Sequence, residues 1–238
     1  MAETTHNFAL PLVQPAQAQK HVTVNEALAR LDALGQLVLA SRSVAAPPPA
    51  PVDGMAWAVP PGAVNAWSGQ GGRVAVASNG GWVFVLPKAG WRAWIADEGI
   101  AALHDGDSWR GGALALGAGG AGLFARVIGW EVDIEAGGGF ATAPVLPANV
   151  LLIAVSARVI APITGNLDSW RLGMDGAEDR FGSGLGTGLG AFARGLLGAP
   201  MALYASEAVV LTPEGGAFGG GGRVRLAAHV LEAGLPGV

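Results

Sequence analysis

The sequence predicts a mostly β protein: an N-terminal arm and α-helix, a small Trp-rich antiparallel β domain, and a C-terminal jelly-roll-like β-sandwich. Two observations support this fold class. Short apolar runs that alternate with a period of two recur from residue 73 onward, punctuated by many of the 39 glycines, as is typical of strands joined by tight turns. A helical period occurs only near the N-terminus. Hydrophobic residues make up 51% of the 238 residues, enough for a packed core.

The first 22 residues are predicted to form an extended arm. Pro11 and Pro15 interrupt this stretch, and proline both fixes its own backbone and disfavours a helical conformation at the residue before it. The helix is expected to begin after the arm, where Thr23 and Glu26 have the spacing of a capping box.

Apolar residues at helical spacing predict a helix over residues 23–40. The Pro-rich segment 47–53 follows soon after and predicts a linker that separates residues 1–46 from the next domain. The apolar stripe of this helix therefore lacks an obvious partner, and we expect it to assemble with other chains. A trimer and a pentamer both fit, because no polar residue sets the register. The stripe comprises Val24, Leu28, Leu31, Leu34 and Val38.

Residues 54–110 are predicted to form the small Trp-rich domain. Six of the eight tryptophans lie between Trp57 and Trp109, among short β-rich runs and Gly-containing turns. This pattern predicts a small antiparallel barrel or roll, with Trp82 and Trp94 in its core because both lie in apolar runs. Residues 111–124 are almost wholly Gly, Ala and Leu, and predict a hinge.

Residues 125–238 alternate again, which predicts antiparallel strands with one wet face. In the last run, Arg223, Arg225 and His229 should face outward. Many short strands with Gly-rich turns favour a sandwich of jelly-roll type. The residues expected to point inward in that run are Val224, Leu226, Ala228 and Val230.

Composition argues against several functions. The formal net charge is −4 and lysine occurs only twice, so a nucleic-acid partner is not expected. The N-terminus lacks a signal-peptide pattern and no long apolar run occurs, so we expect cytoplasmic synthesis without a signal peptide and no membrane insertion. The absence of cysteine excludes disulfides, thiolate metal sites and cysteine nucleophiles.

The titratable residues do not form a recognisable catalytic motif, so no enzyme and no catalytic residue are predicted. Glu131, Asp133 and Glu135 share one strand face at a spacing that a glycosidase could use, but a solvated strand face explains them as well. His21 and Asn25 could supply half of a metal site, but a role in capping the helix and packing against it is the favoured interpretation. No metal or cofactor is predicted.

Acidic residues and one tryptophan of the C-terminal half remain as binding candidates. Asp168, Asp175, Glu178 and Asp179 would suit Ca²⁺ by their chemistry, but their spacing matches no EF-hand loop. Trp170 stands between Asp168 and Arg171. An aromatic ring beside polar groups suits a carbohydrate.

Several motifs resemble a family of proteins encoded in alphaproteobacterial prophages and gene-transfer-agent clusters. In the N-terminal half they are QAQKHVT (17–23), NEAL (25–28), LDAL (31–34), GWRAW (90–94) and GDSW (106–109). In the C-terminal half they are SWRLG (169–173), DRFGSGLG (179–186), Tyr204, VLTPEGG (210–216) and RVRLAAH (223–229).

The resemblance implies a structural virion protein, the head spike or fibre of a gene transfer agent or phage, on the particle surface. Its implied partners are a capsid or vertex protein, another spike protein, further copies of itself and the capsular polysaccharide of the host cell. The candidate glycan-binding residues are Asp168, Trp170, Arg171, Asp179, Arg180 and Tyr204. Two alternatives stay open: a capsule depolymerase, and an architectural spike base without glycan binding.

Overall fold

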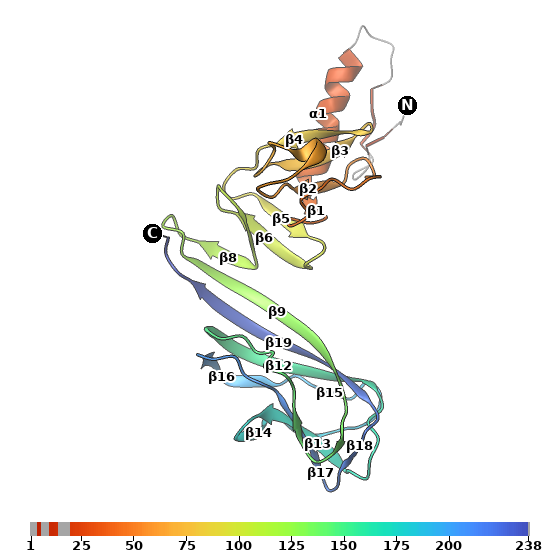
Figure 1. The fold of residues 1–238 in the computed structure, drawn as a ribbon, viewed down its shortest axis with the longest axis vertical. Helices are drawn as coiled ribbons and strands as arrows, with labels where there is room; N and C mark the ends of the chain where they lie inside the picture. The colour runs from red at the N-terminus through yellow and green to blue at the C-terminus, as the bar shows by residue number, and fades with distance from the viewer. Residues whose placement is uncertain (1–3, 6–9, 14–19, 238) are drawn as a thin grey trace. The chain divides into compact units, whose positions relative to one another are not determined.

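Strands make up most of the regular structure in the computed structural model, which describes residues 4–5, 10–13 and 20–237 (Figure 1). In this part of the chain the one α-helix is α1 (Lys20–Gly35). The chain divides into a first unit, Met1–Leu116, and a second unit, Gly117–Val238. The prediction of a mostly β protein with one N-terminal helix is confirmed. No helix in the described residues is long and apolar enough to cross a membrane.

The first unit contains an open seven-stranded sheet of order β4-β3-β2-β1-β5-β6-β7. It is not purely antiparallel as predicted, because the central strand β1 runs parallel to both of its neighbours. The predicted barrel alternative is wrong for the described residues, since β4 and β7 are the two ends of the order. The strands of this unit are β1 (Val38–Leu39), β2 (Ala56–Ala58), β3 (Val74–Ser78), β4 (Gly81–Val85), β5 (Arg92–Ile95), β6 (Ile100–His104), β7 (Trp109–Gly111) and β8 (Ala113–Leu116), with a short 3-10 helix at Asn65–Trp67.

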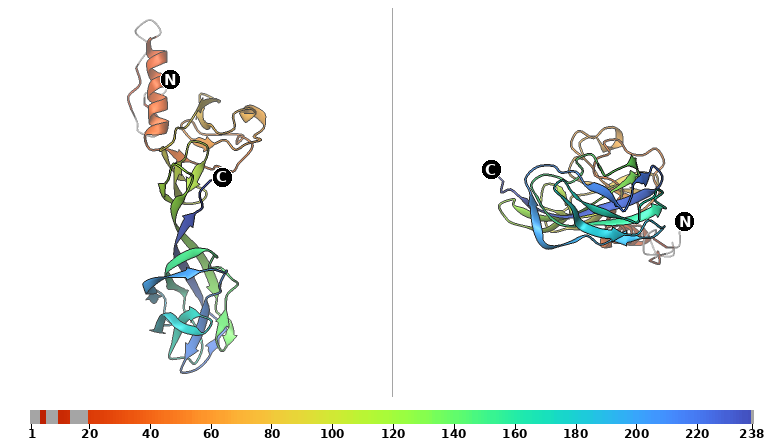
Figure 2. Two further views of the ribbon diagram at one scale, coloured as in Figure 1. Left: turned by 90° about the vertical axis from the view of Figure 1, so that its left-hand side faces the viewer. Right: turned by 90° about the horizontal axis from the view of Figure 1, so that it is seen from below.

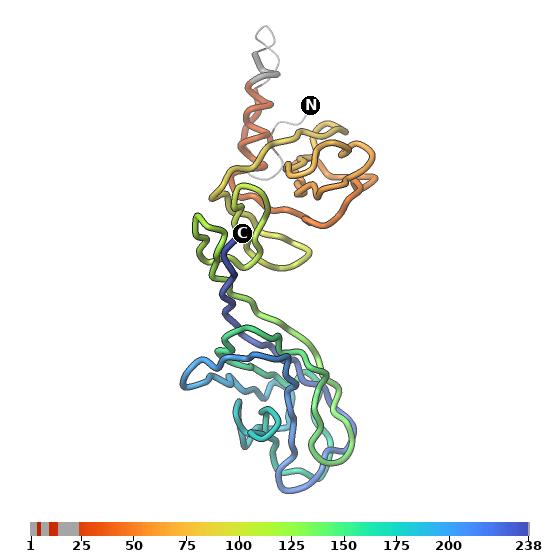
Figure 3. The backbone as a smooth tube through the Cα atoms, turned by 60° about the vertical axis from the view of Figure 1, so that its left-hand side comes forward, coloured from red at the N-terminus to blue at the C-terminus, as the bar shows by residue number. Residues whose placement is uncertain are grey.

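Helix α1 ends at Gly35, before the predicted end at residue 40. The next residues follow a two-residue period instead, with Leu37 and Leu39 buried and Val38 exposed. Val38 and Leu39 therefore form the central strand of the sheet. Figure 3 shows the backbone continuing from the helix (red) into the rest of the first unit. Chain segments on both sides of the Pro-rich segment 47–53 thus share one sheet, and this segment does not separate the residues before it from the next domain.

Both faces of this sheet carry buried side chains, but not to the same extent. One face is covered along its length by a cluster that includes Ala33 of α1, Leu39 and Ile95. The other face is covered by a second cluster around Trp57, Trp67 and Trp82, which belong to or lie near β2–β4. The three indole rings lie 5.1 to 6.1 Å apart between centroids, in tilted and edge-on arrangements.

The second unit is a two-sheet sandwich, as predicted. Its larger sheet has the order β15-β12-β19-β9, with β16 also pairing with β12, and its smaller sheet has the order β11-β17-β13-β14. Figures 1 and 2 show these sheets as two layers. The strands are β9 (Gly122–Asp133), β10 (Ala136–Gly137), β11 (Phe140–Ala141), β12 (Val150–Ala161), β13 (Ser169–Met174), β14 (Ala177–Leu185), β15 (Phe192–Ala193), β16 (Leu196–Leu203), β17 (Val210–Glu214), β18 (Phe218–Gly219) and β19 (Arg223–Gly234).

One continuous core fills the space between the two sheets. Leu152 and Leu226 come from the larger sheet, while Trp170, Leu172 and Leu211 come from the smaller one, and each is at most 1% exposed. The inward face predicted for β19 is confirmed, since all four of its residues are buried. These residues are Val224, Leu226, Ala228 and Val230.

Candidate functional site

Two polar residues of α1 hold described segments of the N-terminal arm. The side-chain amide of Asn25 accepts a hydrogen bond from the backbone N–H of Val13 (2.9 Å) and donates one to its carbonyl (3.0 Å). Asp32, which is buried, accepts a 2.7 Å hydrogen bond from the Thr5 hydroxyl. The predicted roles of His21 and Thr23 concern side chains outside the described residues. Asn25 and Asp32 therefore fix the arm, a role the sequence analysis did not assign.

The apolar stripe predicted for assembly is only partly free. Leu34 packs against the core of the first unit, and Leu28 is half-buried. Val24, Leu31 and Val38 are exposed, Leu31 to 60%. Val38 lies in β1 rather than in the helix. The surface available for contact with another chain is therefore a short patch around Leu31.

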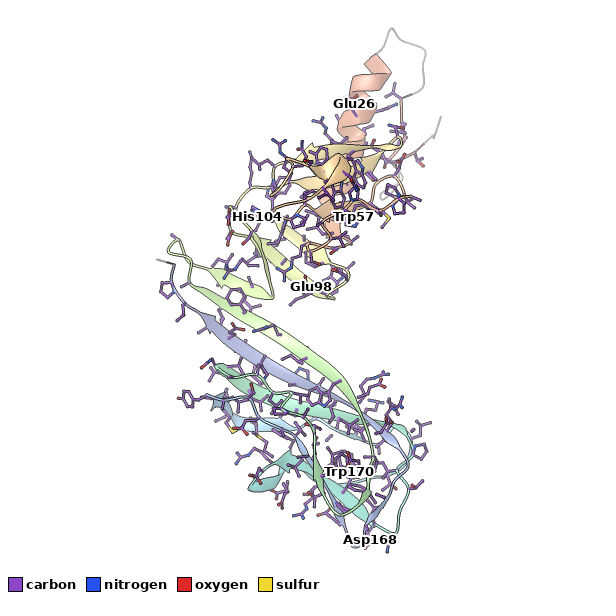
Figure 4. The ribbon with its side chains drawn as sticks, viewed as in Figure 1. Glu26, Trp57, Glu98, His104, Asp168 and Trp170 are labelled. Carbon is purple, nitrogen blue, oxygen red and sulfur yellow. The ribbon has the colours of Figure 1, made fainter. Side chains whose placement is uncertain are left out.

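Trp170 does not form the exposed platform that the sequence suggested. It is 1% exposed, and its indole Nε1–H donates a 3.0 Å hydrogen bond to the carbonyl of Gly186. Figure 4 shows it inside the second unit, with Asp168 toward the end of that unit. Trp170 therefore belongs to the sandwich core, because the inward side of β13 places it opposite the larger sheet.

Arg171 lies next in β13 and points to the outer face of the smaller sheet, where it meets two carboxylates. Its Nε is 3.6 Å from Oε1 of Glu214, and its Nη1 is 3.8 Å from Oε2 of Glu178. Glu214 also accepts hydrogen bonds from the Ser169 hydroxyl (2.6 Å) and the backbone N–H of Gly184 (2.9 Å). The Ser169 bond, then the Gly184 bond and the charge of Arg171, lower the pKa of Glu214. We call this group the Glu214 cluster.

The remaining predicted glycan-binding residues do not converge on the Glu214 cluster. Asp168 precedes β13, and its carboxylate lies against Gly215, where a side chain would clash. Asp179 and Arg180 are exposed on β14. Tyr204 follows β16, which belongs to the larger sheet. The carboxylates considered for Ca²⁺ also stay apart, since no cluster of metal-binding side chains occurs in the described residues.

Tyr204 stands at a groove on the larger sheet, which we call the Tyr204 groove. This groove has a volume of about 300 Å³ and crosses the neighbouring ends of β9, β12, β16 and β19. Its lining is mostly apolar, with Leu151 and Leu231 among the side chains. Asn149 and Glu232 are its polar lining residues, and the Glu232 carboxylate forms an ion pair with Arg126. Tyr204 itself is 85% exposed. Sequence reasoning missed the groove because its residues come from four strands distant in the chain.

Two of the three carboxylates considered for glycosidase chemistry, those of Glu131 and Asp133, are paired with arginines of the neighbouring strand, and Glu135 lies beyond the end of β9. Arg223 forms a 2.6 Å ion pair with Asp133, and Arg225 forms a 2.7 Å ion pair with Glu131. These pairs follow from the register, in which Arg223 lies opposite Asp133 and Arg225 opposite Glu131. The face is a cross-strand ion-pair ladder, an arrangement that stabilises antiparallel strands.

Comparisons with known proteins match parts of the chain. A family model described as a protein of unknown function (DUF2793) matches residues 24–110, which lie in the first unit. A solved structure of the cyanophage Pam1 capsid asymmetric unit is similar over 50% of this chain and 91% of that chain, at 17% identity. Its TM-score is 0.34, too low for the likeness to bear on function. No curated protein matches the chain.

Proposed function

We propose that this chain is a structural component of the surface of a phage-like or gene-transfer-agent particle, and that it binds capsular polysaccharide without cleaving it. The first unit attaches the protein to a capsid or vertex protein or to another spike protein, and the second unit contacts the glycan. The resemblance of motifs in both halves of the sequence to those of head spike proteins supports this assignment. The separate cores of the two units also suit a division of labour.

The Tyr204 groove is the observation that carries the glycan-binding proposal. Binding sites for small ligands are concave and mostly apolar, with a few polar groups that fix orientation. The groove has this composition, with Asn149 and Glu232 beside an apolar floor. The ring of Tyr204 is exposed at the groove and could cover the apolar face of a sugar. A site this small binds weakly, so several copies would be needed for firm attachment to a cell.

The carboxyl groups favour binding over catalysis. Protonating a leaving sugar requires a carboxylic acid whose pKa is raised. Asp105 and Glu214 both have a pKa below the ordinary value. Glu131 and Asp133 are held in ion pairs with arginines. None of these groups is prepared to act as a general acid.

Assembly into an oligomer is proposed through the exposed part of α1. Leu31 is 60% exposed and Val24 is 43% exposed, one helical repeat of seven residues apart. Residues at this spacing lie on the same face of a helix, so the same patch of a second copy could cover them.

The proposed function is tested with purified full-length protein and immobilised bacterial capsular polysaccharides. The wild-type protein should be retained by at least one capsule type, and Tyr204→Ala should weaken retention about tenfold, since loss of a ring contact and its hydrogen bond is worth roughly that factor. Tyr204→Phe is the matched control and should retain most of the affinity. Retention unaffected by Tyr204→Ala would rule out the groove as the glycan site. Shortening of the polysaccharide during incubation would replace the binding proposal with the depolymerase alternative.

A further inference from the structure

The face of the first unit's sheet that carries the Trp57 cluster is covered at one end only. The cluster stands on β2, β3 and β4. Across β1, β5 and β6, side chains on the same face remain open to solvent: Trp94 is 47% exposed and Val38 is 51% exposed. The sequence prediction that Trp94 is a core residue is wrong, because its neighbours Ala93 and Ile95 take the covered face of β5.

A groove of about 480 Å³ lies on this bare part of the sheet, and we call it the Trp94 groove. The register places Ala101 directly opposite Trp94 and Leu103 opposite Arg92. Because alanine is small, the face of the sheet beside the indole is low and flat. Gln36, in the short turn between α1 and β1, adds an exposed amide to the lining.

Arg92 gives the Trp94 groove a positive charge. It is exposed and forms no ion pair with any carboxylate in the described residues, whereas Arg42, elsewhere in the same unit, is bound by Glu98 at 2.6 Å. Arg92 and Trp94 are two residues apart on one strand, so their side chains leave the same face about 7 Å from each other. An unpaired guanidinium beside an exposed indole favours a ligand with an apolar face and an anionic edge.

We propose that the Trp94 groove binds an acidic saccharide, with the apolar face of a uronic acid ring on the Trp94 indole and its carboxylate at the Arg92 guanidinium. Gln36 is positioned to hydrogen-bond to ring hydroxyl groups. A peptide strand cannot add here by backbone pairing, because β1, β5 and β6 are all interior strands of the sheet. This inference goes beyond the proposed function, because it names a ligand class for the first unit, and the glycan site proposed above lies in the second.

The test measures binding of hexasaccharides to the full-length protein. Galacturonate and hyaluronan hexasaccharides provide uronic acids, and maltohexaose is the neutral control. At least one acidic probe should quench tryptophan fluorescence, and maltohexaose should bind about tenfold more weakly. Arg92→Gln keeps the fluorophore and should weaken acidic binding by about tenfold, which is a typical effect of losing a charged hydrogen bond. Trp94→Ala should lower the affinity for the acidic hexasaccharides by a similar factor. Its binding is measured by calorimetry, because the substitution removes the fluorophore.

Tyr204→Ala separates this inference from the proposed function. It should leave the affinity for acidic hexasaccharides unchanged, while Arg92→Gln should leave the Tyr204-dependent retention on capsular polysaccharide in place. The inference is overturned if neither acidic probe binds, if binding survives both Arg92→Gln and Trp94→Ala, or if Tyr204→Ala alone abolishes it. Self-association that Trp94→Ala abolishes, without any saccharide binding, would make the face a contact between copies and would also overturn the inference.

Discussion

The two units cover their sheets in different ways. In the second unit two sheets face each other, so each sheet buries its inner face in one shared core. In the first unit a single sheet has helix α1 and its neighbours on one face, and only the Trp57 cluster on part of the other. The uncovered part of the first unit's sheet leaves Trp94 and Val38 partly in solvent. The larger sheet of the second unit also exposes apolar side chains on its outer face, at the Tyr204 groove, but its inner face is covered throughout. The two units therefore differ in how completely one sheet face is covered from within the same unit.

Two tryptophans show the consequence of this difference. Trp170 of the second unit is 1% exposed, with its Nε1–H bonded to Gly186, whereas Trp94 of the first unit is 47% exposed. Both stand in the middle of a strand. The difference arises from what lies opposite each strand face, and not from the strands themselves.

The largest expected effect is loss of stability in Trp170→Ala. Removing this fully buried side chain leaves a cavity and an unpaired carbonyl at Gly186, and should lower the free energy of unfolding by about 3–5 kcal/mol. The matched variant Trp94→Ala should cost less than about 1 kcal/mol, because nearly half of that side chain is already in water. Guanidinium denaturation followed by circular dichroism measures both. Equal losses in the two variants would contradict the proposed difference in coverage.

The alternation of residues could be predicted from the sequence, but the covered face could be predicted on some strands only. On β19 the inward residues Val224 to Val230 were predicted correctly, because polar residues such as Arg223 and Arg225 mark the other side. On β5 the single polar residue, Arg92, lies on the same face as Trp94, but the large apolar side chain of Trp94 favoured a buried position. One charged residue in a four-residue strand is a weak guide, and the tertiary structure shows that its face is the exposed one.

The polar residues of α1 show a second limit of prediction from the sequence. Asn25 and Asp32 bind residues 12 and 27 positions away in the sequence, so no local pattern identifies their partners. The end of the helix had a local signal, because Gly35 is a typical C-terminal residue. The predicted helix nevertheless ran on to residue 40, because the spacing of Leu34, Leu37 and Val38 fits a helix as well as it fits the strand that follows. The Tyr204 groove, which is assembled from four strands, had no sequence signal beyond Tyr204 itself.

The first unit should lose stability in mild acid. His104 at the end of β6 is buried, accepts a hydrogen bond from the Gly106 N–H at Nδ1, and packs edge-on against Trp109. Burial lowers the pKa of His104, although Asp105 and Asp107 oppose the shift. The unfolded chain therefore binds the proton more tightly than the folded chain, and stability is lost as the pH falls below about 6.5.

Hydrogen exchange measured by mass spectrometry would test this for each unit separately. Peptides from β5 to β7 should exchange faster at pH 5.5 than at pH 7, after correction for the intrinsic rate, and His104→Gln should remove this pH dependence. Peptides from the sandwich core serve as the internal reference. A first unit whose protection is the same at both pH values would show that His104 is not responsible for any pH dependence.

The smallest expected effect is electrostatic and lies on the outer face of the sandwich. The Ser169 hydroxyl, the Gly184 N–H and Arg171 lower the pKa of Glu214 below its ordinary value of about 4.3. Ser169→Ala should raise it, as followed by NMR titration of the carboxyl carbon. Ser183→Ala, on the neighbouring strand β14, is the control and should leave it unchanged.

The lowered pKa stabilises the second unit above about pH 4.3, and this contribution is lost as the pH falls through the folded-state value. Glu214→Gln should therefore flatten the acid limb of the unfolding curve of the sandwich. The first unit should respond at higher pH through His104, so the two units should lose stability in separate pH windows. A Glu214 that titrates at the same pH in wild type and Ser169→Ala would show that the Ser169 bond does not persist in solution.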